Sequence, residues 1–144
     1  MIFEGNLVSI NYNPDTAAHT YTVTFKVLRI YKGDRKLRTV EVKSTSVGDC
    51  TLLIDKADGH LDDKEFIGRH YLLYVSKGKD TYTFDYCKNW VLSDSFIDYN
   101  FTNNTYKRRK DLETSGFFKD EITELNNNLK KLRNSNTKVE KSKK

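Results

Sequence analysis

The sequence contains few of the residues that mark a disulfide scaffold or a membrane protein. Of its 144 residues only two are cysteine and one is proline. Two cysteines allow one internal disulfide at most, which excludes a fold that depends on a dense disulfide framework. Apolar runs stay well below the roughly 20 residues that cross a bilayer, so we expect no membrane span. The chain instead suits one soluble domain with a core of its own.

The first residues do not have the features of a secretory leader. Met1–Gly5 already shows the pattern of a strand, without the charged and apolar regions of a signal peptide. Two possibilities therefore stay open: the protein is cytosolic, or a leader precedes the sequence as given.

Motifs of the common enzyme classes are also missing. The sequence has no H-x-x-H, C-x-x-C or G-x-S-x-G motif and no phosphate-cradling glycine loop. A catalytic thiol needs a histidine base, yet none of the three histidines has a motif relation to Cys50 or Cys87. We therefore predict a non-enzymatic protein with no cofactor and no metal site.

The acidic segment Asp55–Glu65 is the nearest approach to a metal-binding loop. If Gly59 is aligned with the glycine of a calcium loop, Ile54 and Lys56 fall where the first two carboxylates belong. The pattern fails at positions that must carry negative charge, so we interpret the segment as a solvated loop. Weak cation binding by its carboxylates stays open.

Charge is distributed unevenly along the chain, whose formal net charge is +5. Residues 1–100 carry 13 Lys and Arg against 14 Asp and Glu, whereas residues 101–144 carry 12 against 6. The body is thus close to neutral and the C-terminal part is basic. A basic tail favours contact with phosphates or anionic lipids, but it is also typical of a segment that keeps a protein soluble.

Strands dominate the first hundred residues. In Tyr21–Tyr31 the residues alternate, with Tyr21, Phe25 and Arg29 on one face and Lys26 and Ile30 on the other. This period of two, rich in β-branched and aromatic residues, is typical of a strand. Five or six such segments separated by turn residues predict an all-β fold, a small barrel or a sandwich, over residues 1–99.

The C-terminal part has a different period. Five apolar residues recur at helical spacing, namely Phe118, Ile122, Leu125, Leu129 and Leu132. We therefore predict that residues 100–133 form a linker and a C-terminal helix packed on the barrel, although a short coiled-coil contact is an alternative. Residues 134–144 are polar and basic, which predicts a disordered tail.

An ordered set of residues resembles the netrin-like domain family, which includes the N-terminal domain of tissue inhibitors of metalloproteinases. The set is Phe25-x-Val27, Tyr31-x-Gly33, Cys50, Phe66-x-Gly68-x-x-Tyr71-x-x-Tyr74 and Cys87. The resemblance covers about Phe3 to Trp90. It implies a five-stranded Greek-key barrel of the OB type with helices packed on it, which agrees with the all-β fold and C-terminal helix predicted above.

The chain departs from that family at its functional end. In the inhibitors, a Cys-x-Cys at the mature N-terminus chelates the protease zinc, but this chain has no cysteine before Cys50. Metalloproteinase inhibition is therefore disfavoured. In the family, the counterparts of Cys50 and Cys87 bond to different partners, namely those N-terminal cysteines, so the resemblance implies that both lack their partners here and argues against a bond between them. We interpret Cys50 and Cys87 as structural or orphaned cysteines, and whether they bond to each other stays open. We predict an extracytoplasmic binding module, with a protein as its partner, if a leader has been removed.

Binding of single-stranded nucleic acid is the alternative function. OB barrels often bind single strands through aromatic and cationic side chains on one face of the sheet. The candidate surface residues here are Tyr21, Lys26, Arg29, Tyr31, Lys43 and Tyr82. The near-neutral charge of the barrel region disfavours this alternative, because binding to phosphates needs net positive charge along the track.

Overall fold

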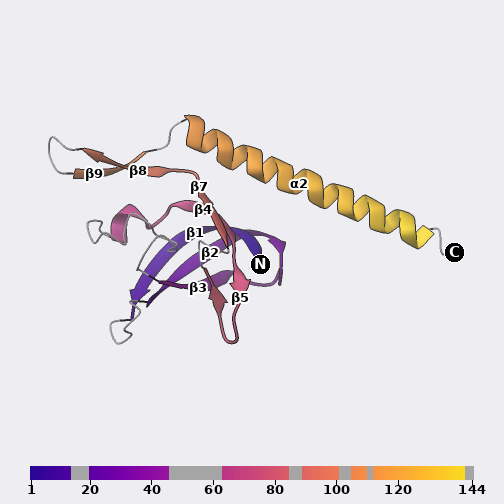
Figure 1. Cartoon of the computed structure of the whole chain (residues 1–144), viewed down its shortest axis with the longest axis horizontal. Helices are drawn as coiled ribbons and strands as arrows, with labels where there is room; N and C mark the ends of the chain where they lie inside the picture. The colour runs from indigo at the N-terminus through magenta and orange to yellow at the C-terminus, as the bar shows by residue number, and fades with distance from the viewer. Residues whose placement is uncertain (14–19, 46–62, 85–88, 101–104, 110–111, 142–144) are drawn as a thin grey trace.

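The computed structural model describes residues 1–13, 20–45, 63–84, 89–100, 105–109 and 112–141, and is mostly β-sheet with a long C-terminal helix (Figure 1). A 3₁₀ turn, η1, covers Asp63–Glu65, and the helix α2 runs over Leu112–Lys141. The strands are, in chain order, β1 Ile2–Tyr12, β2 Thr20–Lys32, β3 Thr39–Thr45, β4 His70–Tyr74, β5 Ser76–Lys77, β6 Tyr82–Thr83, β7 Trp90–Ser93, β8 Phe96–Asn100 and β9 Thr105–Arg109.

Seven strands form one curled mixed sheet, a half-barrel, in the order β5-β6-β3-β2-β1-β4-β7. Strands β1, β2 and β3 form an antiparallel meander, β4 pairs with β1, and β6 runs parallel to β3. Only Val75 separates β4 from β5, so two strands that lie far apart in this order are neighbours in the chain. Strands β8 and β9 pair with each other in a second sheet.

The main core lies on the inner face of the curled sheet. Tyr21, Val23 and Phe25 are all buried there, which confirms the alternation predicted for the first part of β2. The ring of Phe25 meets the rings of Phe3 and Tyr71 edge to face, each with centroids 5.7 Å apart. Burial of each such side chain contributes about 1.5–3 kcal/mol to folding.

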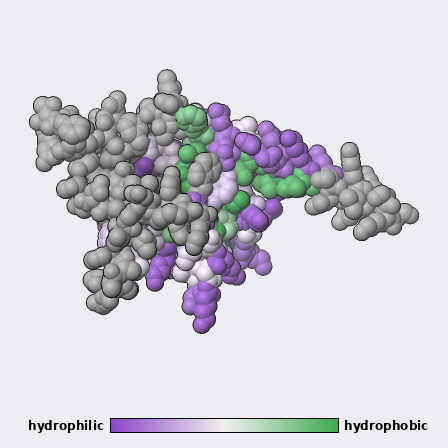
Figure 2. Space-filling view, viewed as in Figure 1, coloured by the Kyte–Doolittle hydropathy of each residue, from purple (hydrophilic) through white to green (hydrophobic). Residues whose placement is uncertain are grey.

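A second apolar cluster joins the outer face of the sheet to α2. Phe118, Ile122, Leu125 and Leu129, which are four of the five residues of the predicted helical stripe, pack there with Tyr31 and Leu72. Figure 2 shows apolar side chains gathered along the side of α2 that lies toward the sheet. Leu72 and its neighbour Leu73 are fully buried in different clusters, as expected for a strand covered on both faces.

Helix α2 is longer than its apolar stripe. The sequence predicts disorder from Asn134, whereas the helix continues to Lys141. No proline or glycine follows Gly116, so the two residue types that most disfavour a helix are absent from this part of the sequence. Leu132, the last residue of the stripe, is 60% exposed and does not belong to the second apolar cluster. The C-terminal end of α2 extends beyond the sheet (Figure 1).

A β-bulge changes the side of the sheet to which the residues in the second half of β2 point. Glu4 lies opposite Arg29 and Gly5 lies opposite Val27, so Leu28 is an extra residue in the ladder. The bulge reverses the alternation beyond it. The prediction that Arg29 shares a face with Phe25 is therefore wrong: Ile30 packs against the main core, and Arg29 lies on the outer face beside Tyr31.

Two glycines of the family-like pattern occupy backbone conformations that other residues rarely adopt. Gly33, in the turn after β2, has a φ of 132°, and Gly68, just before β4, has a φ of 79°. Gly68 also donates its N–H to the carbonyl of Leu7 at 2.8 Å. Both turns therefore depend on the absence of a Cβ atom.

Several sequence predictions fall on segments outside the described residues. Cys50, Cys87 and most of the acidic segment Asp55–Glu65 lie there, so neither a disulfide nor a cation site is placed. The strands β7, β8 and β9 are additions that the strand pattern did not predict. In the part of the chain that is described, no helix combines the length and the hydropathy that a bilayer span requires.

Candidate functional site

A cluster of polar side chains lies on the outer face of the sheet, beneath α2. Its centre is Glu4 on β1, whose carboxylate accepts hydrogen bonds from Tyr31 Oη on β2 and from His70 Nε2 on β4, the latter at 3.1 Å. A carboxylate has no proton to donate, so Nε2 carries the imidazole proton in this pair. One carboxylate thereby joins three strands, and we call these three residues the Glu4 cluster.

The Glu4 cluster holds one negative charge in a partly desolvated place. Burial acts to raise the pKa of Glu4, but the hydrogen bonds from His70 and Tyr31 and the nearby cations outweigh it. The pKa therefore lies below its usual value of 4.5. Burial and the hydrogen bond to Glu4 raise the pKa of Tyr31 well above its usual value of 10.0, so the phenol stays a hydrogen-bond donor even where an ordinary tyrosine ionises.

Helix α2 covers the Glu4 cluster. The Phe118 ring meets the His70 ring edge to face at 4.7 Å between centroids, and Tyr74 Oη donates to Glu121 Oε1 at 2.7 Å. Glu4 is 9% exposed and Tyr31 is 4% exposed under this cover. Since the carboxylate is largely covered and already accepts two hydrogen bonds, we interpret the Glu4 cluster as a structural support for the residues around it.

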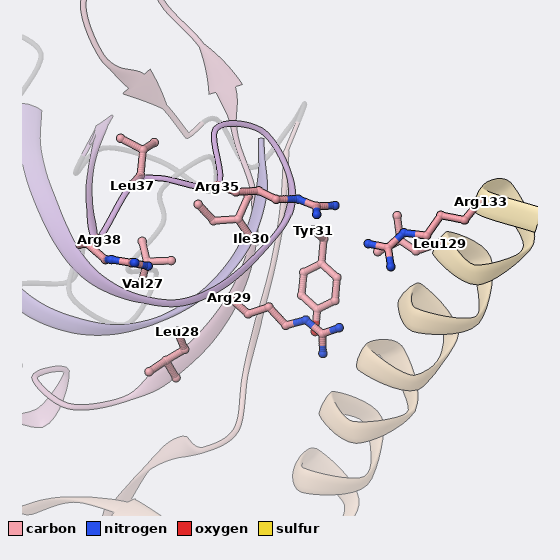
Figure 3. Close-up of a pocket in the computed structure, with 10 residues that line it drawn as sticks. All are labelled: Val27, Leu28, Arg29, Ile30, Tyr31, Arg35, Leu37, Arg38, Leu129 and Arg133. Atoms are coloured by element: carbon pink, nitrogen blue, oxygen red, sulfur yellow. The ribbon is translucent and has the colours of Figure 1, made fainter. Parts of the chain in front are cut away.

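A pocket of about 290 Å³ adjoins the Glu4 cluster, between the end of β2, the β2–β3 connection and the C-terminal half of α2 (Figure 3). Four of its ten lining residues are arginines, namely Arg29, Arg35, Arg38 and Arg133. Five are aliphatic, namely Val27, Leu28, Ile30, Leu37 and Leu129. Tyr31 is the tenth, and none of these ten described residues carries a carboxylate. We call this cavity the arginine pocket.

The arginines reach the pocket from both of its sides. In Figure 3, Arg35 and Arg133 point toward one another from the β2–β3 connection and from α2. The guanidinium of Arg29 lies 4.9 Å from the centre of the Tyr31 ring, within the range of a cation–π contact. Arg38 lies farther along the sheet, beside Val27. The arrangement presents several planar, permanently charged donors to one small volume.

Local structure explains how these arginines come to one pocket. The Leu28 bulge places Arg29 on the outer face, and Gly33 allows the chain to turn immediately after β2. Asp34 then accepts the backbone N–H of Lys36 at Oδ1, at 2.9 Å, as in an Asx turn. That hydrogen bond orders the short connection that carries Arg35.

The structure separates the six residues predicted to form a binding surface. Lys26, Arg29 and Lys43 are exposed. Tyr21 and Tyr31 are buried, at 3% and 4% exposure, and Tyr82 is partly buried against the main core. The three cations are thus at the surface, but the tyrosines do not offer free ring faces beside them.

Sequence reasoning missed most of the residues that line the site. Glu4 reads as an ordinary strand residue, and nothing in the sequence pairs it with His70, which is 66 positions away. The run Arg35-Lys36-Leu37-Arg38 was visible as a local excess of positive charge in a nearly neutral region. Arg133 was visible only as one more cation of the basic end.

Metal ligation finds no support in the described ranges, where no group of three or more histidine, cysteine, aspartate or glutamate side chains is placed to hold an ion. Comparisons of the chain with protein-family models, with curated proteins and with solved structures gave no match. The site is therefore interpreted from its own geometry.

Proposed function

We propose that this protein is a non-enzymatic binding module that holds an anionic group of its partner in the arginine pocket. The observation that supports the proposal is the pocket lining itself, because four of the ten described residues that line it are arginines and none of the ten is an acid. An anion that lies between several guanidinium groups offsets their mutual repulsion and accepts charge-assisted hydrogen bonds from them. The carboxylate of Glu4, in the adjoining cluster, already accepts hydrogen bonds from Tyr31 and His70.

The proposal includes a fold of the OB type and a relation to netrin-like domains. If β4 and β5 are treated as one strand bent at Val75, that strand pairs with β1 at one end and with β6 at the other. With β2 and β3 this arrangement counts five strands in a closed order, which is the strand number of a partly open OB barrel. The positive φ angles of Gly33 and Gly68 give a physical reason for two glycines of the family-like pattern.

A location outside the cytoplasm is part of the same proposal, because netrin-like domains work there. Its support is the resemblance alone. Fractionation of cells that express the protein from its native locus tests the location, and recovery in the cytosolic fraction alone would refute it.

The binding function is tested with a panel of small anions and the full chain. We expect phosphate, sulfate or dicarboxylates to raise the unfolding temperature and to give a saturable heat in titration calorimetry. Arg35→Gln should weaken that binding about tenfold. Lys36→Gln removes the same charge from the adjacent residue, which does not line the pocket, and should leave binding close to that of the wild type. No response to any anion of the panel would refute the function.

Binding of single-stranded nucleic acid is a second candidate, supported by the exposure of three cations. Lys26, Arg29 and Lys43 are available to phosphates. The burial of Tyr21 and Tyr31 removes two of the three stacking partners that this function would use. Fluorescence anisotropy with a labelled oligonucleotide at low salt separates the two candidates, since saturable binding that Lys43→Gln weakens would favour the nucleic acid.

A further inference from the structure

We propose that the ligand of the arginine pocket is a phosphate monoester dianion, and that it bridges α2 to the sheet. The proposal rests on the anion-binding function above and specifies both the chemical class of the ligand and the element that the ligand holds. Three features of the pocket lead to it: the number of donors, the nature of the remaining lining, and the origin of the arginines from two elements.

The first feature is the excess of donors over what one carboxylate can accept. Each guanidinium has five N–H donors in a planar fork, so Arg29, Arg35 and Arg133 together present far more donors than the two oxygens of a carboxylate can engage. A phosphate monoester offers three terminal oxygens and a charge of about −1.5 to −2 at neutral pH. Arginine forks match such oxygens in pairs. The donor set therefore fits a phosphate better than a carboxylate.

The second feature is the size of the pocket and its aliphatic lining. At about 290 Å³ it lies at the small end of the range typical of ligand pockets, about 300–1,000 Å³. Leu28 and Leu37 line it together with the arginines, and Leu28 is 51% exposed. A ligand with a charged head and a short apolar stem satisfies both kinds of lining. A bare inorganic ion leaves the aliphatic side chains uncovered.

The third feature is that the pocket has walls from two elements. Arg133 and Leu129 belong to α2, whereas Arg29 lies on β2 and Arg35 in the connection that follows it. Arg35 and Arg133 point toward one another across the pocket (Figure 3), so an anion between them can contact both elements. A bound dianion attracts both guanidinium groups. It therefore holds the C-terminal half of α2 against the sheet.

The chemical class is tested with two aromatic dianions of equal charge. Phenyl phosphate and phthalate are each titrated into the full chain at a pH slightly above neutral, and their dissociation constants are measured by calorimetry. We expect phenyl phosphate to bind at least about tenfold more tightly. Equal affinities would overturn the phosphate proposal and leave the anion-binding function standing. Absence of binding by both compounds, and by the anion panel, would refute the function itself.

The bridge is tested with variants on its two sides. Arg35→Gln and Arg133→Gln should each weaken phenyl phosphate binding about tenfold, and Lys130→Gln is the matched control on α2. Hydrogen exchange of the amides around Leu129 should slow on addition of phenyl phosphate. If Arg133→Gln binds as tightly as the control, or if exchange is unchanged at saturation, the bridge is refuted.

A further experiment with lipid vesicles distinguishes a lipid headgroup from a soluble compound as the source of the phosphate monoester. Phosphatidic acid presents a phosphate monoester at a membrane surface, whereas phenyl phosphate presents it in solution. Cosedimentation with phosphatidic acid vesicles that Arg35→Gln abolishes identifies a lipid headgroup. Binding of phenyl phosphate without cosedimentation identifies a soluble monoester. In either case the chemistry at the arginines is the same.

Discussion

His70 Nε2 lies 3.1 Å from Glu4 Oε2 across the neighbouring strands β4 and β1. The pair is diagonal in the ladder, because His70 lies opposite Asn6 and Glu4 lies opposite Leu72. The ring of His70 also contacts the ring of Phe118, so the same imidazole joins Glu4 in the sheet to α2. The packing of α2 and the charge state of one carboxylate are therefore linked.

The first prediction concerns acid. The pKa of Glu4 is lowered in the folded protein, so its contribution to stability is fully present above about pH 4.5 and is lost as the pH falls below that value. At neutral pH, Glu4→Gln should lower the unfolding free energy by about 1–3 kcal/mol. Denaturant titrations at several pH values should show this difference shrinking in acid. A difference independent of pH would contradict the linkage.

The second prediction concerns alkali. Burial and the hydrogen bonds to Glu4 and Glu121 raise the pKa values of Tyr31 and Tyr74 above the usual 10.0. Their contribution to stability is therefore fully present below about pH 10 and declines as the pH rises further. In a phenolate absorbance titration, these two tyrosines should ionise together with unfolding. Tyr31→Phe and Tyr74→Phe should each reduce the amplitude of that step, and an unchanged amplitude would refute the assignment.

The third prediction compares two adjacent phenylalanines of α2. Phe118 is 4% exposed and Phe117 is 60% exposed. Phe118→Ala should cost about 3 kcal/mol, because it removes the ring that packs on His70 and Leu72. Phe117→Ala should have little effect. Denaturation followed by circular dichroism measures both, and equal costs would show that α2 does not dock through Phe118.

The fourth prediction compares two glycines. Gly68 has a φ of 79°, so Gly68→Ala should lower the unfolding free energy by about 1–2 kcal/mol. Gly116 lies in α2, where an added Cβ meets no atom within 4 Å. Gly116→Ala should therefore stabilise the protein by up to about 1 kcal/mol. Thermal unfolding measures the change in stability of both variants. If both variants are stabilised, or both destabilised, the positive φ of Gly68 does not decide the effect.

The sequence predicted those features that depend on local period. The alternation of Tyr21, Val23 and Phe25 identified the inner face of β2, because successive side chains of a strand point to opposite sides. The apolar stripe of α2 was predicted for the equivalent reason. Leu132 has the same spacing but is 60% exposed and lies outside the cluster, because helical spacing does not show how far along a helix the packing extends.

The candidate site was not predictable in the same way. The bulge at Leu28 arises from the pairing of β2 with β1, and a single strand carries no record of its partner's register. The Glu4 cluster draws on three strands, and the arginine pocket adds a helix that begins at Leu112. Each contact depends on tertiary structure that composition and spacing do not encode.

Because of the bulge at Leu28, the side of the sheet on which Arg29 lies depends on whether β2 accommodates Leu28 as an extra residue between Val27 and Arg29. If β2 kept Leu28 but paired with β1 without the bulge, Arg29 would turn inward to the core and Ile30 outward to solvent. A single-codon deletion of Leu28 would instead remove the bulge and leave Arg29 opposite Glu4 and Ile30 opposite Phe3, on their present sides. For the same reason, homologues are best aligned across this strand by structure, since a gap placed one residue away would assign the arginine to the wrong side.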